Sequence, residues 1–194
     1  MLEEDGGRAG AISDGEKDGI EMKLVVTVGN GMMGDDAAGP LLAEKLKGAP
    51  LAGWEALNGG SAPENSLFLI REMKPEQVAI VDAADMGLAP GEIRLIADDR
   101  IEDPFFMTTH TLPLSYLMQA LREFVPKVDL IGIQPDVVAF GYPLSDSVKL
   151  AVDRVYDCLG QTGCELASLF ETLAGQEIQA MPAMSGIAGI TDVT

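Results

Sequence analysis

A short apolar run, followed at once by closely spaced glycines and two carboxylates, constrains this chain more than any other feature. Residues 23–39 read KLVVTVGNGMMGDDAAG. The run from Leu24 to Val28 is rich in β-branched residues and predicts a buried strand. A helical pattern starts at Asp36, so the glycines form the turn between strand and helix. Open α/β sheets bind their ligands at such turns, at the carboxyl ends of the strands.

The glycine spacing also matches the dinucleotide-binding fingerprint, which makes a nucleotide-binding oxidoreductase the first alternative. Gly29, Gly31 and Gly34 occupy its three glycine positions. In such sites, however, the helix start receives pyrophosphate, and here it carries Asp35 and Asp36. A carboxylate about 4 Å from a phosphate is repelled by roughly 1 kcal/mol even in bulk water. The acidic residue expected about 20 residues further on is also missing from Asn58-Gly59-Gly60.

The rest of the chain alternates predicted strands with predicted helices. The predicted strands are 24–28, 54–57, 77–81, 91–97 and 128–133. The predicted helices are 36–47, 63–73, 113–125 and 145–159, with a short one within 164–173. This alternation favours a three-layer α/β/α fold, in which helices flank a twisted, mostly parallel five-stranded sheet.

Composition along the chain divides it into three parts. Residues 1–21 are acidic, glycine-rich and poor in large apolar side chains, so we expect a disordered extension. Residues 22–160 carry the strand and helix patterns and form the predicted domain. Residues 161–194 are predicted to add a short helix and a tail of low order.

The charge balance restricts the partners. The chain has 13 basic and 31 acidic residues, a net charge of −18. Such a charge disfavours nucleic acids and anionic membranes, and suits a metal ion or a basic protein. Without a long apolar segment or signal-peptide pattern, we expect a cytoplasmic protein that does not insert into membranes, acting as a monomer. Cys158 and Cys164 are expected to be reduced packing residues.

Three polar residues are predicted to follow strands at one edge of the sheet. Asp36 follows the first strand, Asp82 ends the third, and His110, the single histidine, comes after the fourth. The first and third strands of such a sheet are often neighbours, so the three side chains can converge on one crevice. Together they suit a divalent cation or general acid–base catalysis.

Each candidate also has a structural alternative. Asp36 is a good helix N-cap, Asp82 can bond to loop N–H groups, and His110 can be a surface residue. Asp85 competes with Asp82 for the same role, three residues further along the chain.

Nucleophilic catalysis finds less support in the sequence. The G-x-S-x-G elbow is absent. Ser61 is a possible nucleophile, but its surroundings favour a polar turn and a helix cap.

Taken together, the motifs resemble one family, the maturation endopeptidases of [NiFe]-hydrogenases. The resemblance runs from about Met22 to Leu159, and the extension and the tail have no counterpart in it. It is carried by GNGMMGDD at 29–36, GGSAPEN at 59–65, VDA at 81–83, DMG at 85–87, PGEIR at 90–94, MTTH at 107–110 and GIQPD at 132–136.

The resemblance implies an activity and a site. Members of this family make a single endoproteolytic cut that removes a C-terminal extension from the hydrogenase large-subunit precursor after nickel insertion. Their metal-contacting residues correspond to Asp36, Asp82 and His110, which are then both metal ligands and catalytic residues. Two roles are open for them: to hold a metal that polarises the scissile carbonyl or activates water, or to recognise nickel that the precursor carries. The resemblance favours recognition, with no tightly bound cofactor in the enzyme. A non-catalytic factor that binds metal or precursor is the remaining alternative.

Overall fold

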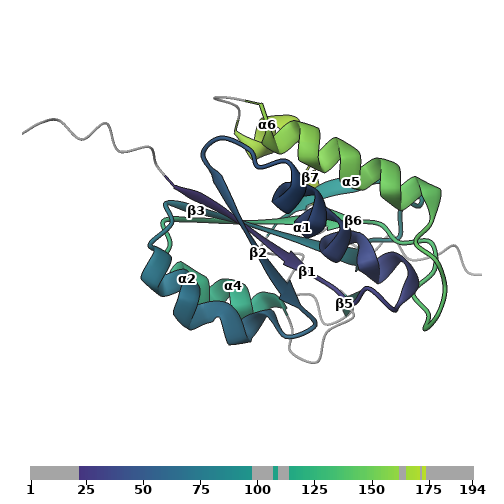
Figure 1. Cartoon of the computed structure of the whole chain (residues 1–194), viewed down its shortest axis with the longest axis horizontal. Helices are drawn as coiled ribbons and strands as arrows, with labels where there is room; N and C mark the ends of the chain where they lie inside the picture. The colour runs from purple at the N-terminus through teal and green to yellow at the C-terminus, as the bar shows by residue number, and fades with distance from the viewer. Residues whose placement is uncertain (1–21, 98–106, 109–113, 162–164, 171, 174–194) are drawn as a thin grey trace, which may run out of the picture.

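The computed structural model describes residues 22–97, 107–108, 114–161, 165–170 and 172–173, which form one sheet with helices on both faces (Figure 1). Its strands are β1 (Lys23–Val28), β2 (Trp54–Gly60), β3 (Gln77–Asp85), β4 (Ile93–Ile96), β5 (Met107–Thr108), β6 (Lys127–Ile133) and β7 (Thr172–Leu173). The α-helices are α1 (Ala38–Gly48), α2 (Leu67–Met73), α4 (Leu114–Arg122), α5 (Asp146–Leu159) and α6 (Leu166–Leu169), and the 3-10 turns are η1 (Gly34–Ala37) and η2 (Pro63–Ser66). None of these helices is long and apolar enough to cross a bilayer.

The sheet has the order β2-β1-β3-β6-β4-β7, with β5 paired to β3. Strands β1, β2, β3 and β6 run parallel, and β4 runs antiparallel to β6. The predicted mostly parallel sheet of five strands is therefore confirmed. Two further strands, β5 and β7, each two residues long, pair with it. Because the chain places β2 on one side of β1 and β3 on the other, the sheet order reverses at β1, directly before the glycine loop.

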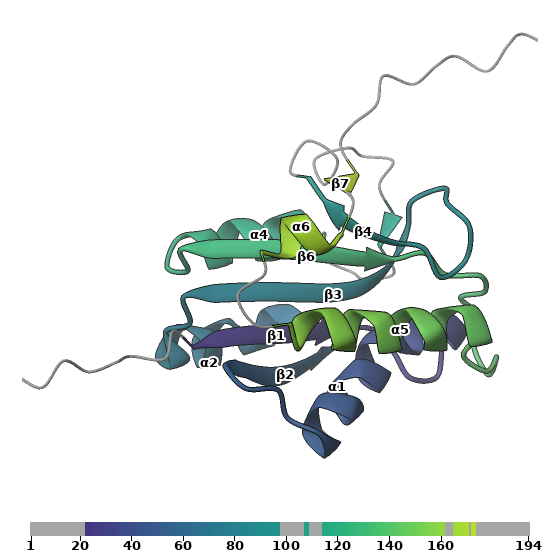
Figure 2. The same ribbon diagram turned by 90° about the horizontal axis from the view of Figure 1, so that it is seen from above.

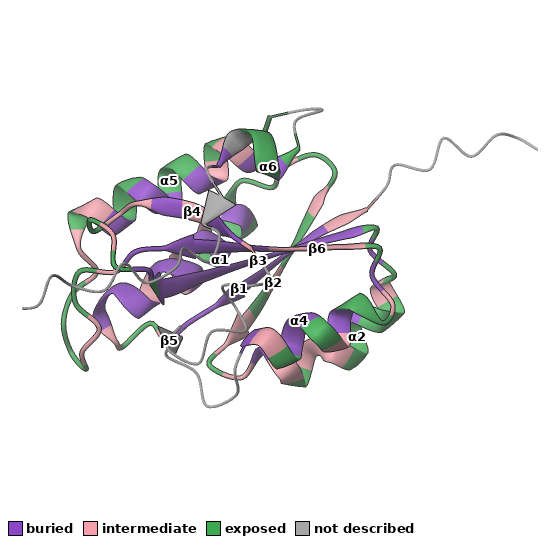
Figure 3. Ribbon diagram, turned by 180° about the vertical axis from the view of Figure 1, so that it is seen from behind, coloured by how far each residue is buried: buried purple, intermediate pink, exposed green. Residues whose placement is uncertain are grey.

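Two hydrophobic clusters, one on each face, hold the three layers together. Alternate β1 residues point to opposite faces, so Val25 packs in the cluster beneath α1 and α5, whereas Val26 packs in the cluster beneath α2 and α4. Figure 2 shows α1 and α5 along one face of the sheet, and Figure 3 shows the buried strands between the helical layers. The carboxyl ends of β1 and β3 are thus fixed in a rigid core.

Three parts of the prediction need correction. The third strand continues to Asp85, so Asp82 lies inside β3; the extra residues pair with β6 and β5. Met107 and Thr108, predicted as loop, form β5 because this segment pairs with the end of β3. The helix predicted from Asp36 begins as the 3-10 turn η1, and the α-helical part starts at Ala38. The helix predicted over 63–73 likewise begins as the 3-10 turn η2, with its α-helical part from Leu67.

The segment after residue 161 adds to the sheet and to the core. The predicted short helix is present as α6, and β7 pairs in parallel with β4. Leu166 and Phe170 lie in the same hydrophobic cluster as α5. The remainder of the predicted tail, 174–194, and the predicted extension, 1–21, lie outside the described residues.

Replacing Gly39 with alanine is expected to destabilise the domain by about 3 kcal/mol, because α1 crosses β1 too closely for a side chain. A Cβ atom at this position would lie 2.0 Å from the carbonyl oxygen of Val28. Gly48, in the last turn of the same helix, is the matched control, since nothing lies within 4 Å of its Cβ position. Gly48→Ala should stay within about 1 kcal/mol of the wild type in chemical denaturation. Equal stability of the two variants would contradict this close contact.

Candidate functional site

Asp36 lies at the carboxyl end of β1, where the glycine loop folds back over the strand. Gly29 has a φ of +140°, and a Cβ atom there would lie 2.0 Å from the backbone oxygen of Asp36. The backbone N–H of Asn30 donates to Asp36 Oδ2 at 2.8 Å, and the Asp36 side chain is buried, with 2% exposure. The N-cap alternative for Asp36 is wrong, since the cap positions of η1 and α1 are Met33 and Ala37. Its carboxylate instead fixes the loop.

The neighbouring Asp35 binds a segment that is more than one hundred residues away in sequence. Its buried carboxylate accepts hydrogen bonds from the backbone N–H groups of Asp136 (2.8 Å), Val137 (3.1 Å) and Ser145 (2.6 Å). The Ser145 hydroxyl donates a fourth bond at 2.9 Å and also caps α5 by accepting from the Val148 N–H. Asp35 therefore joins the glycine loop to the segment between β6 and α5.

These bonds also determine the charge of Asp35. Burial raises the pKa of this carboxyl, whereas the N–H groups of Ser145, Asp136 and Val137 and the serine hydroxyl lower it. The hydrogen bonds prevail, and the pKa of Asp35 lies below its ordinary value of 3.8. The sequence analysis missed this role, because nothing local to Asp35 indicates partners so distant along the chain.

Asp82 is fully buried in β3, on the strand next to β1. Its side chain shares the sheet face of Ile80 and Ala84, which pack in the cluster beneath α2 and α4. Its partner on β6 is Gly132, and the side chains of Ile96 and Met86 pack over that position, since a Cβ atom there would lie 2.6 Å from Ile96 Cδ1. The 3-10 turn η1, which carries Asp36, packs against β3. The structure therefore brings the elements that carry Asp36 and Asp82 into contact.

His110, the third predicted site residue, lies outside the described residues. Of the described residues on either side of its segment, Thr108 pairs with Ala84 near the end of β3. Leu114, which begins α4, belongs to the hydrophobic cluster that includes Ala84. Within the part of the chain that the structure describes, no group of three histidine, cysteine or acidic side chains is arranged to hold a metal ion.

The competing candidates have structural contacts of their own. Asp85 is exposed, and its Oδ1 accepts from the Gly87 N–H at 3.2 Å and from Gln134 Nε2 at 3.1 Å. Gln134 Oε1 in turn accepts from the Met86 N–H at 2.7 Å. Asp85 and Gln134, a buried residue that the sequence analysis missed, thus order the loop after β3. Ser61 is exposed in a turn, and the cap position of η2 is Ala62, so the predicted helix cap is wrong.

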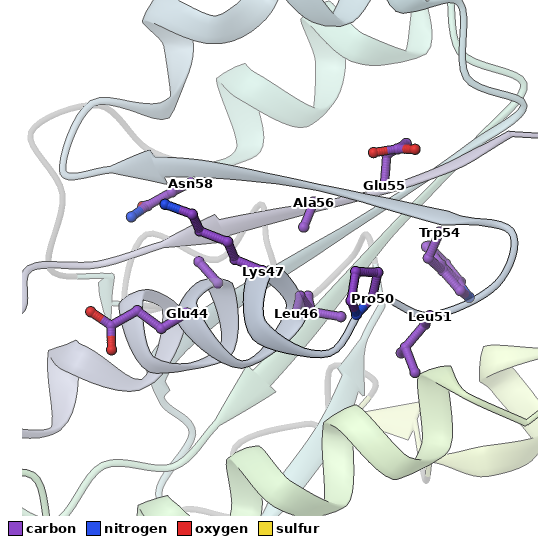
Figure 4. Close-up of a pocket in the computed structure, with 10 residues that line it drawn as sticks. Glu44, Leu46, Lys47, Pro50, Leu51, Trp54, Glu55, Ala56 and Asn58 are labelled. Atoms are coloured by element: carbon purple, nitrogen blue, oxygen red, sulfur yellow. The ribbon is translucent and has the colours of Figure 1, made fainter.

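Two hollows in the described part of the molecule lie away from these carboxylates. One, of about 470 Å³, lies between α1 and β2, where Trp54 and Ala56 face Leu46 and Pro50 of the helix and the segment after it (Figure 4). The other, of about 450 Å³, lies between Gly91 and α5. Neither is lined by Asp36 or Asp82. These two carboxylates therefore lie outside both hollows, unlike the polar groups of a typical small-molecule pocket.

The arrangement suits a metal ion better than a nucleotide phosphate. Carboxylate oxygens are ligands for divalent cations and can act as general bases. A pyrophosphate at the start of α1 would need free loop N–H groups, but the Asn30 N–H is already bonded to the Asp36 carboxylate. The geometry thus disfavours the oxidoreductase alternative for the glycine loop.

Comparison with known proteins gives a consistent result. Residues 40–161 match the HycI family model, described as hydrogenase maturation protease. The chain is 51% identical over 154 residues to the hydrogenase 3 maturation protease of Escherichia coli (strain K12), covering 79% of this chain and 97% of that protein. It resembles the solution structure of the Escherichia coli endopeptidase HycI, with a TM-score of 0.73 and 49% identity over 80% of this chain and 99% of that one. It also resembles the crystal structure of a [NiFe] hydrogenase maturation protease from Thermococcus kodakarensis KOD1. The TM-score is 0.64 and the identity 30%, over 72% of this chain and 90% of that one.

Proposed function

This chain belongs to the hydrogenase maturation protease family, and we propose that it uses Asp36, Asp82 and His110 to engage the nickel ion of its substrate. The protein is an endopeptidase that processes a hydrogenase large-subunit precursor. We further propose that it removes a C-terminal extension by a single cut after nickel has been inserted.

One observation carries the metal-recognition proposal. Asp36 and Asp82 are buried carboxylates, exposed by 2% and 0%, on contacting elements at the point where the sheet order reverses. Carboxylate oxygens are ligands that divalent cations accept. Two carboxylates on contacting elements could therefore engage one nickel ion that the precursor brings. His110, which follows the strand β5 that pairs with the end of β3, would contribute an imidazole nitrogen.

The proposed mechanism divides the metal ligands between enzyme and substrate. The precursor holds nickel through its own ligands, and the enzyme adds oxygen ligands from Asp36 and Asp82 and the His110 imidazole. Because the Asn30 N–H fixes Oδ2 of Asp36 at 2.8 Å, this carboxylate is oriented before the substrate arrives. Hydrolysis then adds a water oxygen to the scissile carbonyl carbon, breaks the C–N bond and leaves a proton on the released amine. Docking of the metal thereby positions the peptide bond to be cut.

We expect the purified enzyme to contain little metal and to shorten nickel-loaded precursor while leaving nickel-free precursor intact. A permanent metal site usually has three firm ligands and an ordered second shell. Here the proposed ligands depend on the precursor to complete the coordination. The measurement is the mass of the precursor after incubation, with metal content determined in parallel on the same enzyme.

The control is enzyme pretreated with a chelator and returned to metal-free buffer, which should still cut nickel-loaded precursor. Efficient cutting of nickel-free precursor by this enzyme would refute nickel recognition but leave the protease assignment intact. Binding of the precursor without any loss of mass would instead favour the alternative of a non-catalytic maturation factor.

The proposed function also includes a cellular location, an oligomeric state and a partner. We propose that the protein acts in the cytoplasm as a monomer, with the precursor as its macromolecular partner. A net charge of −18 supports the absence of a nucleic-acid partner, since phosphate backbones require basic surfaces.

A further inference from the structure

Four exposed apolar side chains gather on the two segments that Asp35 joins. The solvent-exposed fraction is 62% for Met32, 74% for Phe140, 59% for Tyr142 and 37% for Val137. We refer to these four residues as the apolar rim. Large apolar side chains that are exposed together, rather than singly, are typical of interaction surfaces.

Backbone hydrogen bonds make the rim one surface and connect it to the site. The N–H of Gly141, between Phe140 and Tyr142, donates to the Met32 carbonyl oxygen at 2.9 Å. The N–H of Asp35 donates to the carbonyl oxygen of Val137, also at 2.9 Å. Gly34 fits only because it has no side chain, since a Cβ atom there would lie 2.4 Å from that same oxygen. These hydrogen bonds therefore hold the apolar rim and the glycine loop in a fixed arrangement.

The charge pattern of the rim differs from that of the rest of the chain. Residues 137–145 read VVAFGYPLS, without a charged side chain between Asp136 and Asp146, in a chain of net charge −18. The glycine loop from Gly29 to Gly34 is likewise uncharged. Interface cores are depleted of charged residues and enriched in methionine, tyrosine and phenylalanine. The composition of the rim therefore suits contact with another protein.

We propose that the apolar rim is the docking surface for the folded part of the precursor next to the segment that is cut. This inference rests on the proposed function. Met32 belongs to the same glycine loop as Asn30, whose N–H donates to Asp36, and the Gly141 N–H joins Phe140 and Tyr142 to Met32. A folded protein that brings its metal to Asp36 would therefore lie close to the rim. Anionic membranes and nucleic acids would be repelled by a chain of net charge −18. The rim thus contributes to affinity for the precursor, whereas Asp36 and Asp82 contribute to the reaction.

The test compares two phenylalanines of nearly equal exposure. Phe140, in the rim, is exposed by 74%, and Phe68, on α2, by 76%. Phe140→Ser should raise KM for nickel-loaded precursor, and Kd for a precursor with an uncleavable junction, by at least about tenfold, with kcat within about twofold of wild type. Phe68→Ser should leave all three constants within about twofold. Thermal unfolding of both variants should match the wild type, because neither side chain is buried.

The other outcomes contradict either precursor docking at the apolar rim or the proposed function. Equal KM and Kd for the two variants would overturn the inference, as would a loss of kcat alone in Phe140→Ser. Self-association of the wild type that Phe140→Ser abolishes would assign the rim to a second copy of this chain and overturn precursor docking. If the wild type binds the precursor but never shortens it, the proposed function fails, and the Kd comparison still decides the role of the rim.

Discussion

Replacing Asp36 with asparagine is expected to reduce shortening of nickel-loaded precursor by at least about a thousandfold while the domain stays folded. An asparagine keeps the size of the side chain and an acceptor for the Asn30 N–H, but it loses the negative charge that we propose engages nickel. Asp82→Asn and His110→Ala should have comparable effects. If the three residues hold one ion, double substitutions should add little to the single ones. The measurements are single-turnover rates of precursor shortening, with circular dichroism spectra of each variant.

Asp85 is the matched control for these substitutions. It follows Asp82 by three residues, but it is exposed and bonded to Gly87 and Gln134. Asp85→Asn should therefore retain shortening within a few-fold of the wild type. The opposite pattern, with Asp82→Asn active and Asp85→Asn inactive, would transfer the proposed role to Asp85. Full activity of His110→Ala would remove the histidine from the proposed site.

Replacing Asp35 with alanine is expected to destabilise the protein by about 4 kcal/mol, because three backbone N–H groups and one hydroxyl lose a buried, charged acceptor. These donors belong to Asp136, Val137 and Ser145, so the segment before α5 would separate from the glycine loop. Ser145→Ala, which removes the hydroxyl bond and the N-cap of α5, should cost about 1–2 kcal/mol. Urea denaturation of the wild type and both variants gives these differences. Wild-type stability in Asp35→Ala would contradict the role of this carboxylate.

The pH dependence of unfolding separates the charge of Asp35 from its packing. Since its pKa is lowered in the folded state, its charge stabilises the fold above the ordinary pKa of 3.8. This stabilisation is lost as the pH falls below that value toward the lower pKa of the folded protein. The stability difference between wild type and Asp35→Ala should therefore be constant near neutral pH and shrink in acid below pH 3.8. A constant difference down to the acid limit would assign the effect to packing alone.

The sequence was sufficient to predict the elements and the layers. The apolar run of β1 and the helical spacing of Leu114, Leu117, Met118 and Leu121 are local patterns, and all of these residues are buried. Strand and helix alternation then predicted the parallel sheet, because helical crossovers connect parallel strands. The family resemblance followed from residues in linear order, such as the glycines and carboxylates of 29–36. Local propensity and order along the chain were enough for these conclusions.

Pairing between distant segments required the tertiary structure. The sequence suggested that Asp82 ends its strand, but pairing with β5 and β6 extends β3 to Asp85. It gave Asp35 no role beyond repelling a phosphate, yet Asp35 accepts hydrogen bonds from residues 101 to 110 positions away. It gave no reason to group Met32 with Phe140 and Tyr142, which one backbone hydrogen bond brings together. Composition and periodicity depend on neighbours in the chain, whereas these contacts depend on the order of the strands in the sheet, which only the folded chain decides.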